Sequence, residues 1–157
     1  MIGRAEIDRQ RQKLDATFDR LSTAGADPEL MADSARYLCV LVAGFLEQAV
    51  IEIALEHVRT HSHSSVQRHI EGRLRRFTSA NTQNIVKLLG SFNPDWRSDL
   101  EAYIVDQYKS AVDSVVNLRH TVAHGRYTGV TMVGVRNYYT LVKQVVEHCA
   151  NLCIPES

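Results

Sequence analysis

The sequence has few of the residues that break helices, and it lacks a charge of one sign. Three Pro and eight Gly in 157 residues favour long helices. Eighteen Lys plus Arg balance eighteen Asp plus Glu, which excludes a polybasic coat for nucleic acid but leaves local patches open. Cysteines number three, an odd count without framework spacing, so a disulfide scaffold is excluded and a reducing cytoplasm is favoured.

Long apolar runs and a leader-like start are also missing. The longest uncharged apolar run, residues 37–46, is about half as long as a bilayer span requires. The chain turns charged at Arg4 and Glu6, unlike a secretory leader. Hydrophobic residues make up 45% and charged residues 23%, which is a globular composition. We therefore expect one cytoplasmic domain over residues 1–157, with no membrane partner.

Apolar residues recur with helical spacing along most of the chain. Residues 28–60 are apolar on most sides of a helix, which is typical of the buried centre of a bundle. Asp27–Pro28 and Asn93–Pro94 are signals for helix starts, and Gly125 is a signal for a helix end. The sequence thus predicts an all-α fold, a four-helix-type bundle with one or two short extra helices. The predicted helices span residues 5–21, 28–60, 66–77, 81–89, 94–123 and 135–152, with a loop or short extended piece at 128–134.

The stretch from Asn117 to Gly125 is the most informative about chemistry. Arg119 precedes His124 by five positions, about 140° around a helix, so on a regular helix they would not share a face. We expect the last turn before Gly125 to fray, which would let His124 approach Arg119 in a cleft. Arginine presents a planar fork of donors to phosphate, and neutral histidine can accept a proton near physiological pH. The alternative is a capped helix end, with the arginine paired to an acid and the histidine bonded to a terminal carbonyl.

This pattern resembles a known superfamily. Arg119, four residues, then His124 and a glycine near the end of the third major helix resemble the R-x4-H motif of the HEPN superfamily, closest to its RiboL-PSP-like branch. Glu47, inside the apolar helix, resembles the acidic residue that the second HEPN helix often directs at the same site. The resemblance extends from about Ala5 to Leu152. It implies a homodimer in which two motifs face each other across a two-fold axis, and it implies no metal and no cofactor.

The resemblance also implies an activity. His124 would activate the ribose 2′-hydroxyl or protonate the leaving 5′-oxygen, and Arg119 would stabilise the charge that grows on the phosphate. RNA would be cut to a 2′,3′-cyclic phosphate, and the protein would serve as a toxin or defence effector. Glu47 needs a partner because a buried unpaired carboxylate is costly, and pairing with Arg119 would satisfy both a structural and a positioning role. The alternative is a catalytically inactive HEPN-like helical dimer that binds RNA or a partner protein.

Residues around the motif give weaker indications. Many family members have Asn or Asp directly after the arginine, whereas here His120 stands there and either joins the site or lies at the surface. Asn117 is a further candidate for support of the site. Members paired with a nucleotidyltransferase antitoxin often carry tyrosine two residues after the histidine. Here Tyr127 is three away, which argues against its modification, although an antitoxin protein remains an expected partner. Arg126 would add a phosphate contact, and Tyr127 would stack on a base.

The segment 59–76 is locally basic, with five arginines against one acid. Arg68, Arg73, Arg75 and Arg76 are therefore candidates for contacts to the RNA backbone, and the alternative is an ordinary solvated face.

Histidines and cysteines at helical spacing raise the question of metal. His57 and His61 stand four apart, as a helical zinc pair would, with His63 and His69 nearby. No third ligand follows at a suitable spacing, so we expect no metal site. Cys149 and Cys153 are also four apart, and we expect them to pack as small apolar side chains.

Overall fold

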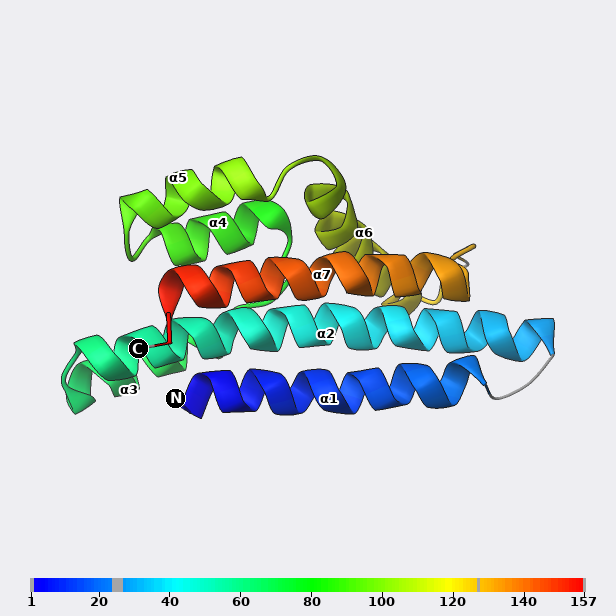
Figure 1. The fold of residues 1–157 in the computed structure, drawn as a ribbon, viewed down its shortest axis with the longest axis horizontal. Helices are drawn as coiled ribbons and strands as arrows, with labels where there is room; N and C mark the ends of the chain where they lie inside the picture. Colours follow the sequence, from blue (N-terminus) through cyan, green and yellow to red (C-terminus); the bar gives the residue numbers. More distant parts are fainter. Residues whose placement is uncertain (1, 24–26, 127, 157) are drawn as a thin grey trace.

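The computed structural model describes residues 2–23, 27–126 and 128–156, and within them the chain is helical without strands, which confirms the all-α prediction (Figure 1). The helices are α1 (Ile2–Ser22), α2 (Pro28–His61), α3 (Ser64–Leu74), α4 (Thr82–Gly90), α5 (Pro94–Tyr103), α6 (Asp106–Ala123) and α7 (Met132–Cys153). The four long helices α1, α2, α6 and α7 form the predicted bundle. Between the predicted helices 5–21 and 28–60, residues 24–26 lie outside the described residues.

Helix α2 is the centre of the bundle, because α1, α6 and α7 all pack against it. In Figure 1, α1, α2 and α7 lie side by side along the long axis, with the α4–α5 hairpin above α7. Leu38, Leu46 and Ile53 have no exposed surface, and burying each such side chain contributes about 1.5–3 kcal/mol. By length and composition α2 also contains a stretch apolar enough to cross a membrane, and 67% of that stretch is buried within the molecule.

The predicted helix starts are confirmed by their caps. Asp27 Oδ1 accepts a hydrogen bond from the Glu29 backbone N–H at 3.0 Å, and Asn93 Oδ1 accepts one from Asp95 at 2.8 Å. In both helices proline occupies the first turn, where its missing N–H costs nothing. The start of α7 differs from the prediction. Thr131 caps it by accepting from the Gly134 N–H at 3.0 Å, so residues 132–134 are helical rather than loop.

The predicted continuous helix over residues 94–123 is wrong. The helix breaks at Ile104 and Val105, and Asp106 starts α6 with a φ of 51°. An unbroken helix of that length would be about 45 Å long, whereas α7, which packs beside α6, is about 33 Å long. The break instead buries Ile104, which is 2% exposed, and folds α5 back along α4. It thereby adds a third short helix to the one or two that were predicted.

The three cysteines are buried and free, which confirms that Cys149 and Cys153 pack as apolar side chains. Burial raises the pKa of the Cys39 thiol to about 11 and that of Cys153 to about 12. These thiols are therefore neutral and unreactive at physiological pH.

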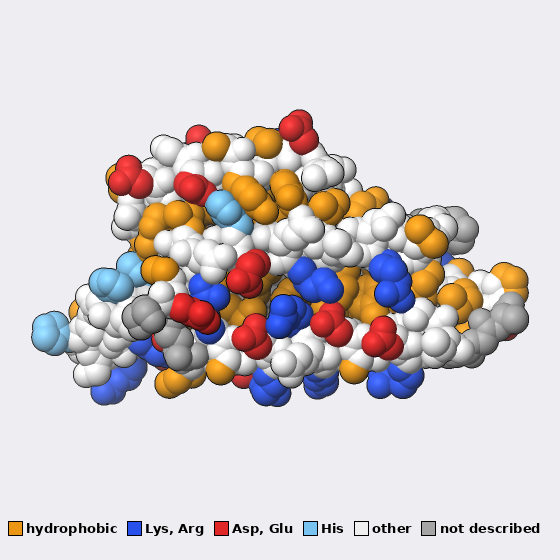
Figure 2. Space-filling view, in the orientation of Figure 1, with side chains coloured by type: hydrophobic (Ala, Val, Ile, Leu, Met, Phe, Trp, Pro, Cys, Tyr) orange, Lys and Arg blue, Asp and Glu red, His pale blue; other side chains and the backbone are white. Residues whose placement is uncertain are grey.

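Charges of both signs alternate on the face that α1 and α7 share (Figure 2). Lys143 Nζ lies 3.3 Å from Asp15 Oδ1, and Arg4 Nη1 lies 3.8 Å from Glu147 Oε1. Because neighbouring charges offset one another, this face presents no field of one sign to a polyanion.

Candidate functional site

The end of α6 is closed by a Schellman motif. The Arg126 N–H donates to the Thr121 carbonyl at 3.0 Å, and the Gly125 N–H donates to the Val122 carbonyl at 3.0 Å. Gly125 has a φ of 69°, a left-handed conformation that only glycine adopts cheaply. Because these bonds satisfy the terminal carbonyls, the last turn is regular, and the predicted fraying next to His124 is wrong.

Arg119 is held by Glu47 from the centre of α2. Arg119 Nη1 donates to Glu47 Oε2 at 3.0 Å, and the same oxygen accepts the Ser79 N–H at 3.3 Å. The predicted Glu47–Arg119 pair is therefore present, and it gives the buried carboxylate two donors. The Glu47 side chain is 12% exposed and that of Arg119 is 40% exposed. The guanidinium thus has one edge fixed by the protein and another side open to a ligand.

His124 lies beside His120 rather than beside Arg119. Both imidazoles are exposed, and their ring centroids are 5.1 Å apart in an edge-to-face arrangement. His124 is the C-cap residue of α6, about 140° around the helix from Arg119. Within the described residues no hydrogen bond joins Arg119 to His124. A single chain therefore presents the two motif residues on different sides of α6.

One side of α6 opens on an apolar groove, which we term the α1–α2 groove. It has a volume of about 570 Å³, and Arg119 and Glu47 border it. Tyr37 lines it with 54% of its surface exposed, and an added Cβ at Gly44 would meet nothing within 4 Å. Further lining residues, from α1 and α2, are Lys13, Leu14, Thr17, Arg20, Val40 and Leu41.

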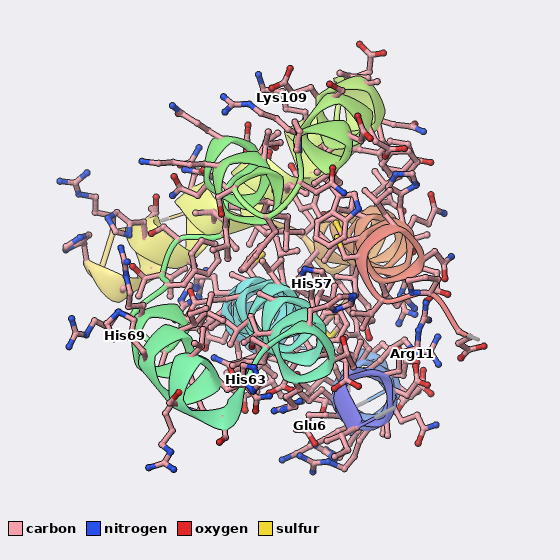
Figure 3. All side chains as sticks on the ribbon, turned by 90° about the vertical axis from the view of Figure 1, so that its left-hand side faces the viewer. Glu6, Arg11, His57, His63, His69 and Lys109 are labelled. Carbon is pink, nitrogen blue, oxygen red and sulfur yellow. The ribbon has the colours of Figure 1, made fainter. Side chains whose placement is uncertain are left out.

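Another groove, which we term the α4–α6 groove, lies between α4, α5 and α6. It has a volume of about 680 Å³ and is lined by polar and charged side chains, including Lys87, Arg97, Lys109, Asp113 and Asn117. Figure 3, an end-on view of the bundle, labels Lys109 near the α4–α5 hairpin. Of these residues only Asn117 was singled out from the sequence. The missed signal is the spacing of Lys109, Asp113 and Asn117, four apart on one side of α6.

The arginines proposed from the sequence as RNA contacts lie on or just after α3, and all four are exposed. Arg75 Nη2 bonds to Glu71 Oε1 at 2.6 Å. Arg76 borders a hollow of about 420 Å³ that Lys87 also lines, next to the α4–α6 groove. Arg126 is exposed beyond the end of α6, and Tyr127 lies outside the described residues.

The four histidines at and after the end of α2 do not gather at one point. The rings of His57 and His61 are 4.3 Å apart, and Phe92 and Trp96 pack on His57. Burial, and secondarily His61, lowers the pKa of His57. Figure 3 shows His57 near the centre of the view and His69 at its edge; His57 is half-buried, whereas His63 and His69 are exposed. Within the described residues no group of three or more His, Cys, Asp or Glu side chains is arranged to hold a metal ion.

These features define a small helical domain with an Arg–Glu pair and two exposed imidazoles at one end of a bundle helix. The sequence profile of the RiboL-PSP-HEPN family matches residues 5–154, so the chain belongs to that family. HEPN domains are often ribonucleases, which makes RNA cleavage the activity that this membership supports. Searches of curated proteins and of solved structures found no match.

Proposed function

We propose that the protein is a metal-independent endoribonuclease that acts as a homodimer. The observation that carries the proposal is the end of α6, where His124 and His120 are exposed on one side and a half-exposed Arg119, oriented by Glu47, lies on another. Family membership supplies the class of reaction.

The proposed reaction needs a base, an acid and a charge stabiliser. One imidazole, from His124, removes the proton of the ribose 2′-hydroxyl, whose oxygen attacks the adjacent phosphorus. The bond from phosphorus to the 5′-oxygen breaks, and a second imidazole donates a proton to that oxygen. The guanidinium of Arg119 stabilises the charge on the phosphate oxygens. The products are a 2′,3′-cyclic phosphate and a 5′-hydroxyl, and DNA is resistant because it has no 2′-hydroxyl.

A second copy would complete this site. In one chain Arg119 and His124 lie on different sides of α6, whereas a two-fold partner would add a second imidazole and a second guanidinium. The α1–α2 groove fits such a partner, because it is largely apolar, ends at Arg119 and exposes 54% of Tyr37.

The activity is tested by His124→Ala with a labelled single-stranded RNA in the presence of EDTA. We expect wild type to produce cyclic-phosphate ends and the variant to lose at least about 100-fold in rate, because its base is gone. His69→Ala, an exposed histidine on α3, is the matched control and should cut like wild type. Cleavage by His124→Ala at the wild-type rate would falsify the assignment.

The second candidate is a catalytically inactive helical dimer that binds RNA or a partner protein. The apolar α1–α2 groove favours it, since that surface fits a protein whether or not catalysis occurs. Absence of RNA cleavage by a wild-type dimer would select this candidate.

We also propose a role as a toxin or defence effector in the cytoplasm, restrained by an antitoxin protein. Expression of wild type should then arrest growth, and expression of His124→Ala should not.

A further inference from the structure

The α4–α6 groove collects positive charge from three helices. Lys87, Arg97 and Lys109 line it from α4, α5 and α6 in turn. Of its two acids, Glu101 is paired with Arg97, whose Nε donates to Glu101 Oε1 at 3.0 Å, and Asp113 Oδ1 accepts the uncharged Thr82 N–H at 2.8 Å, so the lining keeps an excess of positive charge. Neither Lys87 nor Lys109 forms an ion pair within the described part of the chain, and both are exposed. Two ammonium groups therefore remain for an anionic ligand.

The groove leads to the histidines. Lys109, Asp113 and Asn117 line it, and His120 and His124 continue the same side of α6 at spacings of three and four. From Lys109 to His124 the helix rises about 22 Å. Away from the histidines, Lys87 lines both the groove and the neighbouring hollow that Arg76 borders. Arg76, Lys87 and Lys109 thus extend from the end of α3 into the groove, and Asp113 and Asn117 lie between Lys109 and the imidazoles.

The polarity of the groove favours nucleic acid over protein. Asn81, Gln83 and Asn117 add amide groups beside the lysines, whereas the core of a protein interface is depleted in charge. Amides and ammonium groups are the donors that bind phosphate and ribose.

We propose that the α4–α6 groove binds the single-stranded RNA segment adjacent to the cut, with Lys87 and Lys109 as its phosphate contacts. This inference rests on the proposed ribonuclease function, because it takes RNA as the ligand. Arg76 extends this set of cations, so that one of the four arginines proposed from the sequence belongs to it.

The experiment measures binding of the full chain to a fluorescein-labelled, 2′-fluoro-substituted single-stranded RNA, in EDTA, by fluorescence anisotropy at several salt concentrations. The 2′-fluoro groups prevent cleavage. Lys87→Gln/Lys109→Gln removes two charges from the groove. The matched control, Arg9→Gln/Arg136→Gln, removes two exposed charges from α1 and α7, away from both grooves. Sedimentation of each variant reports its oligomeric state.

We expect the groove variant to raise Kd about tenfold and to reduce the salt slope by about 1.4, which is 0.7 for each lost phosphate contact. The control should change Kd by less than about twofold. Equal losses of RNA affinity in the groove variant and the control variant, a loss in the control variant alone, or no RNA binding by wild type would each overturn the inference. So would a groove variant with unchanged Kd whose mass has fallen to that of a single chain, since the groove would then be a protein interface.

Cleavage by the same proteins separates this inference from the proposed function. If wild type binds RNA through the lysines but does not cut, the ribonuclease proposal fails and the binding groove stands. If wild type cuts and the groove variant binds equally well, the binding groove alone fails.

Discussion

The two grooves beside α6 differ in chemistry, although the two residues of the R-x4-H motif lie one near each groove. The α1–α2 groove is largely apolar and is bordered by Arg119 with its partner Glu47. The α4–α6 groove is polar and leads along α6 toward His124. An offset of five residues on a regular helix directs two side chains to different sides. A motif of this spacing therefore connects two surfaces instead of forming one compact pair.

Under our proposals the two grooves bind different partners: the α1–α2 groove binds a second copy of the chain, and the α4–α6 groove binds RNA. Removing apolar surface from water is favourable, which suits a protein partner, whereas exposed lysines without an ion pair suit a polyanion. Each prediction below alters a residue of one groove or of a helix that forms it.

The largest effect is expected from Leu41→Glu in the α1–α2 groove. A carboxylate in the apolar contact with a second copy should weaken dimerisation by about 2–4 kcal/mol, which is 30-fold to 1,000-fold in the dimer dissociation constant. RNA cleavage should fall with the dimer fraction. Sedimentation and cleavage measure the two effects. Gln83→Glu, at the other groove, should leave the dimer intact. If the Leu41→Glu protein is dimeric and active, the second copy does not bind in this groove.

The next effect concerns the carboxylate behind Arg119. Glu47→Ala should lower the free energy of unfolding by about 1–3 kcal/mol, because the Ser79 N–H and the Arg119 guanidinium lose their shared acceptor. Glu47→Gln retains an acceptor oxygen and should recover most of the stability. Urea unfolding measures both variants. In cleavage assays Glu47→Ala should act as a positioning defect that lowers the rate without abolishing it. Equal stability of wild type and Glu47→Ala would mean that the pair contributes nothing.

Substitutions at two glycines, one near each groove, should have opposite effects on stability. At Gly90 an added Cβ would lie 2.7 Å from Arg97 Cβ, so Gly90→Ala should cost about 1–2 kcal/mol and displace Arg97 in the α4–α6 groove. At Gly44 an added Cβ meets nothing, so Gly44→Ala should stabilise α2 by about 0.5–1 kcal/mol. The Leu41→Glu background keeps dimerisation out of the measurement. The two substitutions should change the free energy of unfolding in opposite directions, which urea unfolding measures. A loss of stability in both variants would contradict the open space at Gly44.

Much of the fold was predictable because local signals agreed with tertiary packing. The apolar composition of residues 28–60 predicted a central helix, and α2 is that helix. Asp27 and Asn93 predicted the starts of α2 and α5, since an N-cap satisfies backbone donors locally. The Glu47–Arg119 pair was predictable because a carboxylate inside an apolar helix requires a partner.

What could not be predicted depends on long-range packing. The apolar period runs through Ile104 and Val105 without interruption, so nothing in the pattern marks the break that folds α5 onto α4. The α4–α6 groove depends on that break, because its lining residues come from three consecutive helices whose arrangement the break determines. The fraying expected at His124 was also wrong, because the glycine that stops α6 completes its capping.

The smallest effect is expected from His57, where α2 meets the α4–α5 hairpin that forms one wall of the α4–α6 groove. Phe92 and Trp96 pack on its ring, and burial followed by His61 lowers the pKa of His57 below its usual value of 6.5. Below pH 6.5 the unfolded chain therefore binds more protons at this residue than the folded chain, and stability decreases as the pH falls. His57→Gln should flatten this dependence between pH 7 and 5 in urea unfolding, whereas His69→Gln should not. An unchanged slope in His57→Gln would show that protonation of His57 does not oppose packing of the hairpin on α2.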